Sequence, residues 1–75
     1  MNVVVFKCED WDVAYLNGML WAQGHSLSDK QLITLGVIAG DIEKVHFYYQ
    51  EDSEIDLPEF PNLIKDVNME LFYKE

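Results

Sequence analysis

Residues 2–6 read NVVVF, a run in which every position after the asparagine is apolar and three are β-branched. β-Branched side chains favour extended backbone, and an apolar run of this length fits a strand that is buried on both faces. We therefore expect residues 2–6 to form an interior strand of a sheet. The rest of the fold then has to cover this strand on both sides.

The segment after this strand carries apolar residues at helical spacing. Two acidic residues begin the segment, Gly24 ends it, and the apolar residues between them include Val13, Leu16 and Leu20. Acidic residues favour the first turn of a helix, and glycine is common directly after the last turn. This pattern predicts a first helix over residues 9–24.

A second helix is predicted from a capping motif. Residues 28–31 read SDKQ, in which the serine and glutamine side chains can bond each other's free backbone amides at a helix start. Apolar residues continue at helical spacing as far as Gly40, so we expect a helix over residues 28–39. Several β-branched residues and an interior glycine leave a strand over residues 32–39 as the alternative.

The remaining residues predict two more strands separated by a loop. Residues 42–50 alternate between an apolar side (Val45, Phe47 and Tyr49) and a side that faces water (Lys44, His46 and Tyr48). Residues 51–59 have the composition of a loop, and one or two helical turns are expected within residues 60–66. Alternation returns over residues 67–73, which predicts the last strand.

These elements predict an α+β fold in a single domain, residues 1–75, with the order β-α-α-β-loop-β. The expected architecture is a three-stranded, mostly antiparallel sheet packed by two helices. A βαββαβ ferredoxin-like arrangement is the alternative. A domain this small buries a modest fraction of its surface, so oligomerisation is a further expectation.

Composition narrows the class of protein. The chain is 49% hydrophobic with ten aromatic residues, so it has the material for a core, and its formal charge is -9 with five lysines and no arginine. Cys8 is the single cysteine, which excludes an internal disulfide and favours a reducing cytoplasm. We expect neither a signal peptide nor a membrane span, because acids follow the first apolar run at once. Strong negative charge disfavours nucleic acid and anionic lipid and favours a basic partner.

The acidic residues form two groups. The first crowds residues 51–59 without any lysine and comprises Glu51, Asp52, Glu54, Asp56 and Glu59. The second lies at the expected ends of elements and comprises Glu9, Asp10, Asp12, Asp41 and Glu43. The first group can belong to a solvated loop and the second can cap helices, or the acids of both groups can dock on a basic surface. We identify the first group, with Asp10, Asp12, Asp41 and Glu43, as the candidate partner-binding residues.

Metal binding and catalysis are not expected. The alternate acids from Asp52 resemble the start of a calcium loop, but Leu57 and Leu63 occupy the positions that require glycine and glutamate. His25 and His46 have no partner at ligand spacing, and no serine lies in a nucleophile motif. We therefore assign no catalytic residue, no metal and no cofactor, and we do not expect an enzyme.

The first predicted helix offers a possible homodimer interface. Its small residues Ala14, Gly18 and Ala22 are four apart and line one side, flanked by Trp11 and Tyr15. Val13, Leu16 and Leu20 line the opposite side. A helix that is apolar on two sides has to be covered twice, so one side could meet a second copy of the chain.

With its size, charge and acidic residues 51–56, the chain resembles the small acidic proteins that bacteriophages use as DNA mimics. Members of that class occupy the DNA-binding surfaces of host proteins. The resemblance implies a competitive inhibitor of a basic host protein, with a nucleoid-associated protein such as the histone-like protein HU as the favoured target. Carboxylates would pair with the lysines and arginines that normally bind DNA, and Tyr48 and Tyr49 could supply uncharged contact area.

The alternative function belongs to a different class. In that hypothesis the chain is a protein-interaction module, such as an antitoxin-like or assembly subunit. It would bury the side of the first helix that carries Trp11, Tyr15 and Trp21 against a specific partner. The acids would then only maintain solubility.

Overall fold

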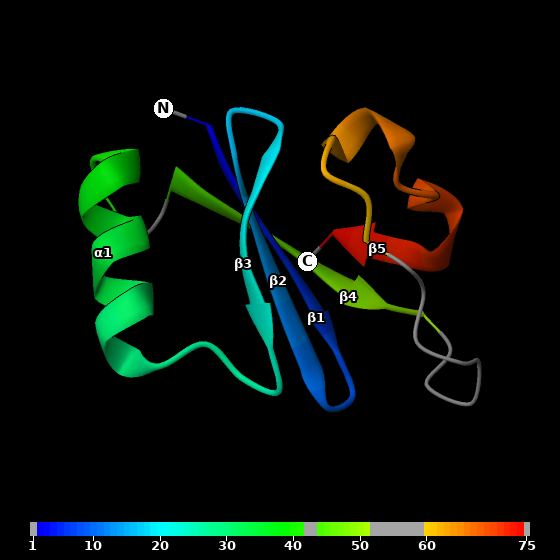
Figure 1. Cartoon of the computed structure of the whole chain (residues 1–75), viewed down its shortest axis with the longest axis horizontal. Coiled ribbons are helices and arrows are strands. Elements are labelled where there is room, and N and C mark those ends of the chain that lie inside the picture. The colour runs from blue at the N-terminus through cyan, green and yellow to red at the C-terminus, as the bar shows by residue number, and fades with distance from the viewer. Residues whose placement is uncertain (1, 42–43, 52–59, 75) are drawn as a thin grey trace.

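The structure of the chain is a computed structural model, which describes residues 2–41, 44–51 and 60–74. These residues form five β-strands, one α-helix and two short 3₁₀ turns. All five strands belong to one mixed sheet with the order β3-β2-β1-β4-β5 (Figure 1). The predicted order β-α-α-β-loop-β is therefore wrong, because three strands precede the helix and two follow it.

The central strand is β1 (Val3–Cys8), which lies where an interior strand is predicted. It pairs antiparallel with β2 (Trp11–Leu16) and parallel with β4 (Val45–Gln50). Its residues from Val3 to Phe6 are all buried, at 7% exposure or less. The prediction of a strand covered on both faces is confirmed, and the strand extends two residues beyond the predicted run.

The predicted first helix over residues 9–24 is wrong. This segment is an antiparallel hairpin of β2 and β3 (Met19–Gly24). Asn17 and Gly18 form its turn, with φ angles of 49° and 82°. Asn-Gly is a preferred pair for a two-residue hairpin turn, because both central positions adopt positive φ.

Helical spacing occurs in this hairpin because β2 is apolar on both faces. Val13 and Tyr15 join the core on one face of the sheet, and Ala14 joins the core on the other. All three side chains are completely buried. A strand without a polar face gives no clear period of two, so its apolar residues also match the period of a helix.

The predicted second helix is confirmed as α1 (Asp29–Ala39), and the strand alternative is wrong. The Ser28 hydroxyl accepts a hydrogen bond from the Gln31 amide at 3.2 Å, and the Gln31 side chain accepts one from the Ser28 amide at 3.0 Å. Gly40 ends the helix with φ of 93°, the left-handed conformation that glycine adopts without strain.

Strand β4 is confirmed over the described part of its predicted range except Lys44, which precedes the strand, whereas the face expected to be wet is partly covered. Val45 and Phe47 pack toward α1, as the alternation predicts. Tyr48, on the opposite face, packs against Phe6 with 5.5 Å between the ring centroids. The C-terminal segment supplies the cover that leaves Tyr48 half-buried.

The predicted last strand over residues 67–73 is wrong for most of its length. Strand β5 (Phe72–Lys74) has three residues and pairs antiparallel with β4. Before it, 3₁₀ turns occupy Ile64–Asp66 and Met69–Leu71, and the first lies where a helical turn is expected. The Asn68 side chain accepts a hydrogen bond at 3.2 Å from the backbone two residues on, a local bond that competes with strand pairing.

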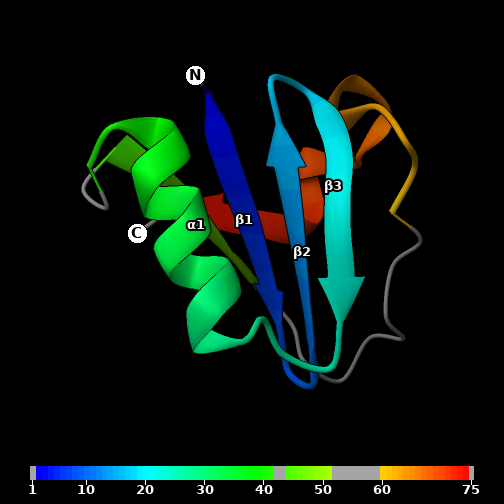
Figure 2. The same cartoon turned by 60° about the vertical axis from the view of Figure 1, so that its left-hand side comes forward.

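The sheet is covered on both faces. Figures 1 and 2 show α1 on one side of the sheet and the segment of residues 60–71 on the other. The core under α1 contains Val3, Val5, Ala14, Leu27, Leu35, Ala39 and Val45. The core under the C-terminal segment contains Val4, Phe6, Val13, Tyr15, Val67 and Phe72. The two cores share the central strand, whose successive side chains point to opposite faces.

The α+β class is confirmed, while the finer architecture differs from the prediction. Both the three-stranded sheet with two helices and the ferredoxin-like alternative are wrong, because the described residues form five strands and one helix. In the described part of the chain, no helix has the length and apolar character needed to cross a bilayer.

Candidate functional site

Four side chains form a row across neighbouring strands of the sheet. Lys7 on β1 is paired with Asp12 on β2 and with Tyr49 on β4, and Tyr49 is paired in turn with Tyr73 on β5. Lys7 lies two residues beyond Val5, whose side chain is in the core under α1, so the row lies on the same face as the helix.

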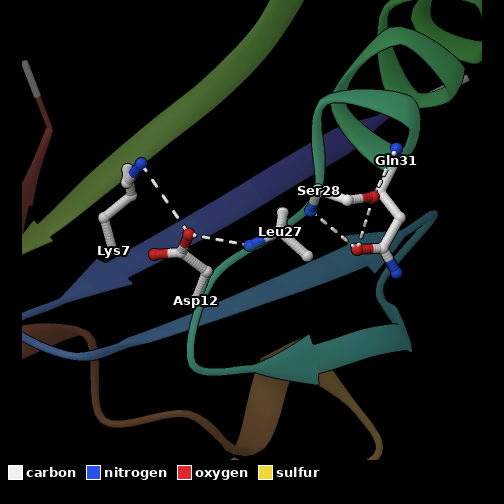
Figure 3. A network of polar contacts seen from close by, with 5 residues as sticks. All are labelled: Lys7, Asp12, Leu27, Ser28 and Gln31. Carbon is white, nitrogen blue, oxygen red and sulfur yellow. Dashed lines mark hydrogen bonds and ion pairs between the residues drawn. The ribbon is translucent and has the colours of Figure 1, made fainter.

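Asp12 has a structural role at one end of this row. It is 7% exposed, and its Oδ2 atom accepts a hydrogen bond from the Leu27 amide at 3.1 Å and lies 3.8 Å from Lys7 Nζ (Figure 3). These contacts attach the connection between β3 and α1 to the sheet. The identification of Asp12 as a partner-binding residue is therefore wrong, because its carboxylate is already occupied inside the fold.

An open groove of about 330 Å³ lies at the other end of the row. It is lined by Lys7, Cys8, Glu9, Tyr49, Gln50 and Tyr73. The rings of Tyr49 and Tyr73 stack, with centroids 5.7 Å apart and planes inclined by 28°. Tyr73 is 49% exposed, so the groove presents an aromatic surface to solvent.

The groove does not contain an activated thiol. Cys8 is free and half-buried. Burial raises the pKa of the Cys8 thiol, and the nearby charge of Asp12 raises it further. Since the thiolate is the reactive form of cysteine, Cys8 is a poor nucleophile at neutral pH.

Carboxylates gather at the end of the sheet where this groove opens. Because β1 and β4 run parallel, the residues that follow them lie at the same edge. The β1–β2 turn carries Glu9 and Asp10, and β4 is followed by Glu51. Helix α1 begins at Asp29, two residues after the Leu27 amide that bonds Asp12, so its start lies toward the same end of the sheet (Figure 2). All four are exposed, and we call this set the acidic end.

The acidic end has few positive charges among the described residues. Lys7 is paired with Asp12, and Lys30 is exposed in the first turn of α1. Asp10 lies 3.5 Å from His25 through Oδ2 and Nδ1, and both side chains are more than four-fifths exposed. An exposed pair of this kind is weak, so the acidic end keeps most of its negative potential.

The predicted partner-binding acids are only partly brought together. Asp10 and Glu51 lie at the acidic end, while Asp41 is exposed beyond the C-terminus of α1, at the opposite end of the sheet. Glu43, Asp52, Glu54, Asp56 and Glu59 lie outside the described residues. The acidic sequence of residues 51–59 nevertheless starts from the acidic end, with Glu51.

The small-residue stripe does not exist as a surface, because its residues lie in a hairpin instead of a helix. Ala14 and Tyr15 are completely buried on opposite faces of the sheet, and Gly18 is in the turn. Ala22 packs toward α1, and Trp11 donates a hydrogen bond to Gln23 at 3.2 Å and contacts the His25 ring. The expected dimer interface on this stripe is wrong, and so is docking through the aromatic side of a first helix.

Sequence reasoning missed Lys7 and Tyr73 as site residues. The Asn-Gly pair after Leu16 was the available signal, because a hairpin turn there makes residues 11–16 a strand and not part of a helix. The short turn at Glu9 and Asp10 then folds that strand back on β1 and places Lys7 opposite Asp12. Nothing local marks the pairing of Tyr49 with Tyr73. That contact depends on how β5 returns to the sheet.

The described residues contain no group of three or more histidine, cysteine, aspartate or glutamate side chains that could hold a metal ion. No protein family model, curated protein or solved structure matches this chain.

Proposed function

We propose that this chain is an acidic protein-binding domain that docks on the basic DNA-binding surface of a partner and competes with DNA. The observation that carries this proposal is that the exposed residues Glu9, Asp10, Asp29 and Glu51 lie toward one end of the sheet. The formal charge of -9 strengthens the attraction to any cationic surface. These acids come from three separate parts of the chain, and the fold brings them together.

The mechanism is competition for cations. Lysine and arginine side chains of a DNA-binding protein release counterions from DNA when they bind phosphates. Here they pair with carboxylates carried by the β1–β2 turn, by the residue after β4 and by the start of α1. A basic surface occupied in this way has no free cations left for DNA.

A nucleoid-associated protein of the bacterial cytoplasm is the favoured target. Such proteins bind DNA mainly through its backbone, so an acidic surface that imitates charge and spacing without any base is sufficient to compete. This choice rests on the resemblance to phage DNA mimics and on the charge of the chain.

The test is a competition assay with a matched charge control. A purified histone-like nucleoid protein is bound to a fluorescent DNA duplex, and the chain is titrated in while anisotropy reports the bound DNA. The test variant carries Glu9→Lys and Asp10→Lys at the acidic end. The control carries Asp41→Lys and Asp66→Lys, which make the same change in net charge; Asp41 follows the other end of α1, and Asp66 lies in the turn that begins beside Gly18.

We expect the test variant to compete about 5- to 30-fold less well than the wild type, as the loss of two exposed charge contacts implies. The control should lose less than half of that effect on a logarithmic scale. Equal losses in the two variants would show that net charge matters and that the acidic end does not. Failure of the wild-type chain to displace DNA at any concentration would remove the proposed function.

A second candidate function is favoured by exposed apolar residues. Ile33 and Val37, one turn apart on the outer face of α1, are 68% and 77% exposed. Trp21, on the edge strand β3, is 37% exposed. This alternative is an interaction module that docks through apolar contacts, and Val37→Glu would then weaken partner binding more than any change at the acidic end.

A further inference from the structure

We infer that the groove lined by Tyr49, Tyr73 and Glu9 accepts an arginine side chain of the basic partner. This inference rests on the proposed function and specifies which partner residue is bound. The groove opens at the acidic end, so a partner held there by charge brings its own cationic side chains to the groove.

The aromatic wall suits a planar cation. The Tyr49 and Tyr73 rings stack at 5.7 Å, which holds Tyr73 in place on the short edge strand β5. About half of Tyr73 remains exposed. A guanidinium group stacks on a tyrosine face through both its flat shape and its positive charge.

The rim of the groove supplies a counter-charge. Glu9 lines the groove and is exposed at the start of the β1–β2 turn. A carboxylate there can receive two parallel hydrogen bonds from a guanidinium that rests on the tyrosines. Glu51 directly follows Gln50, another lining residue, and adds a second negative charge near the groove.

Lys7 also lines the groove, but its charge is held by another residue. Its Nζ atom lies 3.8 Å from the buried Asp12 carboxylate (Figure 3), and Asp12 belongs to β2, which lies on the other side of β1 from β4. The pair is close to neutral together, and the aliphatic part of Lys7 remains available to line the groove. Glu9 therefore sets the charge that a ligand meets.

Arginine fits this groove better than the other candidates. An anion is disfavoured by Glu9 and by the charge of the whole chain. A lysine ammonium is compact and strongly hydrated, and it cannot bond a carboxylate in a bidentate way. An uncharged aromatic group would gain nothing from Glu9.

The test compares two short peptides of equal charge, Gly-Arg-Gly-Arg-Gly and Gly-Lys-Gly-Lys-Gly. Each peptide is titrated into the chain, whose tyrosine rings are isotopically labelled, and binding is followed by NMR. We expect the arginine peptide to shift the Tyr49 and Tyr73 ring resonances and to bind roughly two- to fivefold more tightly than the lysine peptide. Both peptides place a cation over the ring, but only the guanidinium stacks flat on it and forms a second hydrogen bond to Glu9, and one additional hydrogen bond contributes roughly this two- to fivefold difference. Tyr73→Ala should abolish this preference. Lys74→Ala, on the same strand but the opposite face, should retain it.

Two results overturn the inference while leaving the proposed function intact. One is equal affinity for the two peptides, with both bindings weakened by salt. The other is an arginine preference that persists in Tyr73→Ala, which would place the arginine site elsewhere. If neither peptide binds and the chain does not displace DNA from the nucleoid protein, the inference and the proposed function fail together.

Glu9→Gln provides a check that does not alter the tyrosines, because it should lower the affinity for the arginine peptide while the ring stack is kept.

Discussion

Asp12 shows why the acidic side chains of this protein cannot be treated as one population. Its neighbour two residues earlier, Asp10, is exposed in a turn, whereas Asp12 is buried and bonds the Leu27 amide and Lys7. The strand boundary separates them, because Asp10 lies in the β1–β2 turn whereas Asp12 lies within β2, where it reaches the Leu27 amide. The sequence records both residues only as acids near the start of an element.

Replacement of Asp12 should therefore cost stability. Asp12→Ala leaves the buried Leu27 amide without an acceptor and removes the counter-charge of Lys7, so we expect the free energy of unfolding to fall by about 1–3 kcal/mol. Urea unfolding followed by tryptophan fluorescence measures this difference. Asp10→Ala is the matched control and should change stability by less than about 0.5 kcal/mol. Equal effects of the two substitutions would contradict the role of Asp12.

Tyr15 provides a prediction on pH dependence. Its ring is completely buried and its hydroxyl donates a hydrogen bond to the Pro61 carbonyl at 2.7 Å. Burial raises the pKa of Tyr15 in the folded chain, so the unfolded chain loses this proton at a lower pH than the folded one. The stability that Tyr15 contributes is complete below about pH 10, the ordinary tyrosine value, and is lost as the pH rises above it.

Tyr15→Phe should accordingly change two measurable quantities. Loss of the hydrogen bond lowers the free energy of unfolding at neutral pH by about 1 kcal/mol. The decline of stability above pH 10 should become less steep, because the titrating group is gone. Chemical denaturation at a series of alkaline pH values tests both. A decline of unchanged slope would show that Tyr15 does not titrate differently in the two states.

The hairpin of β2 and β3 and the helix α1 differ in how far local sequence determines them. For α1, the Ser28 and Gln31 pair and the terminal Gly40 favour the same helix, and the structure contains both the capping box and the glycine cap. For the hairpin, apolar spacing favours a helix and the Asn17-Gly18 pair favours a turn. The turn prevails because Asn and Gly adopt positive φ more easily than other residues, and positive φ is incompatible with the interior of a right-handed helix. It also prevails because β2 gains a paired strand on each side.

Gly18 should be the most sensitive glycine of this hairpin. Its φ of 82° is strained for any residue with a Cβ atom, and a Cβ here would meet the Ile64 side chain at 3.4 Å. We expect Gly18→Ala to lower the free energy of unfolding by about 1 kcal/mol or more. Gly24→Ala, at the end of β3, is the control, because nothing lies within 4 Å of its added Cβ. Thermal unfolding of both variants measures these changes in stability. A Gly24→Ala effect as large as that of Gly18→Ala would contradict the special sensitivity of Gly18.

The arrangement of charge over the folded chain was beyond local prediction. The net charge and the acid-rich residues 51–59 are visible in the sequence, and so is the central strand β1. The parallel pairing of β1 with β4 is what brings Glu9 and Glu51 to the same edge, although 42 positions separate them. The groove needs a further return of the chain, since Tyr73 reaches Tyr49 only when β5 pairs with β4. Contacts at such separations follow from topology, which no short motif in this chain encodes.

Salt dependence is the most direct test of an acidic docking surface. Binding of the chain to a purified histone-like nucleoid protein can be measured by titration calorimetry at several salt concentrations. If carboxylates at the acidic end replace DNA phosphates, the logarithm of the association constant should fall linearly with the logarithm of salt concentration. We predict a loss of affinity of roughly tenfold or more between about 50 and about 200 mM salt. An affinity that does not change over this range would contradict the account and would favour docking through the exposed apolar residues of α1 and β3.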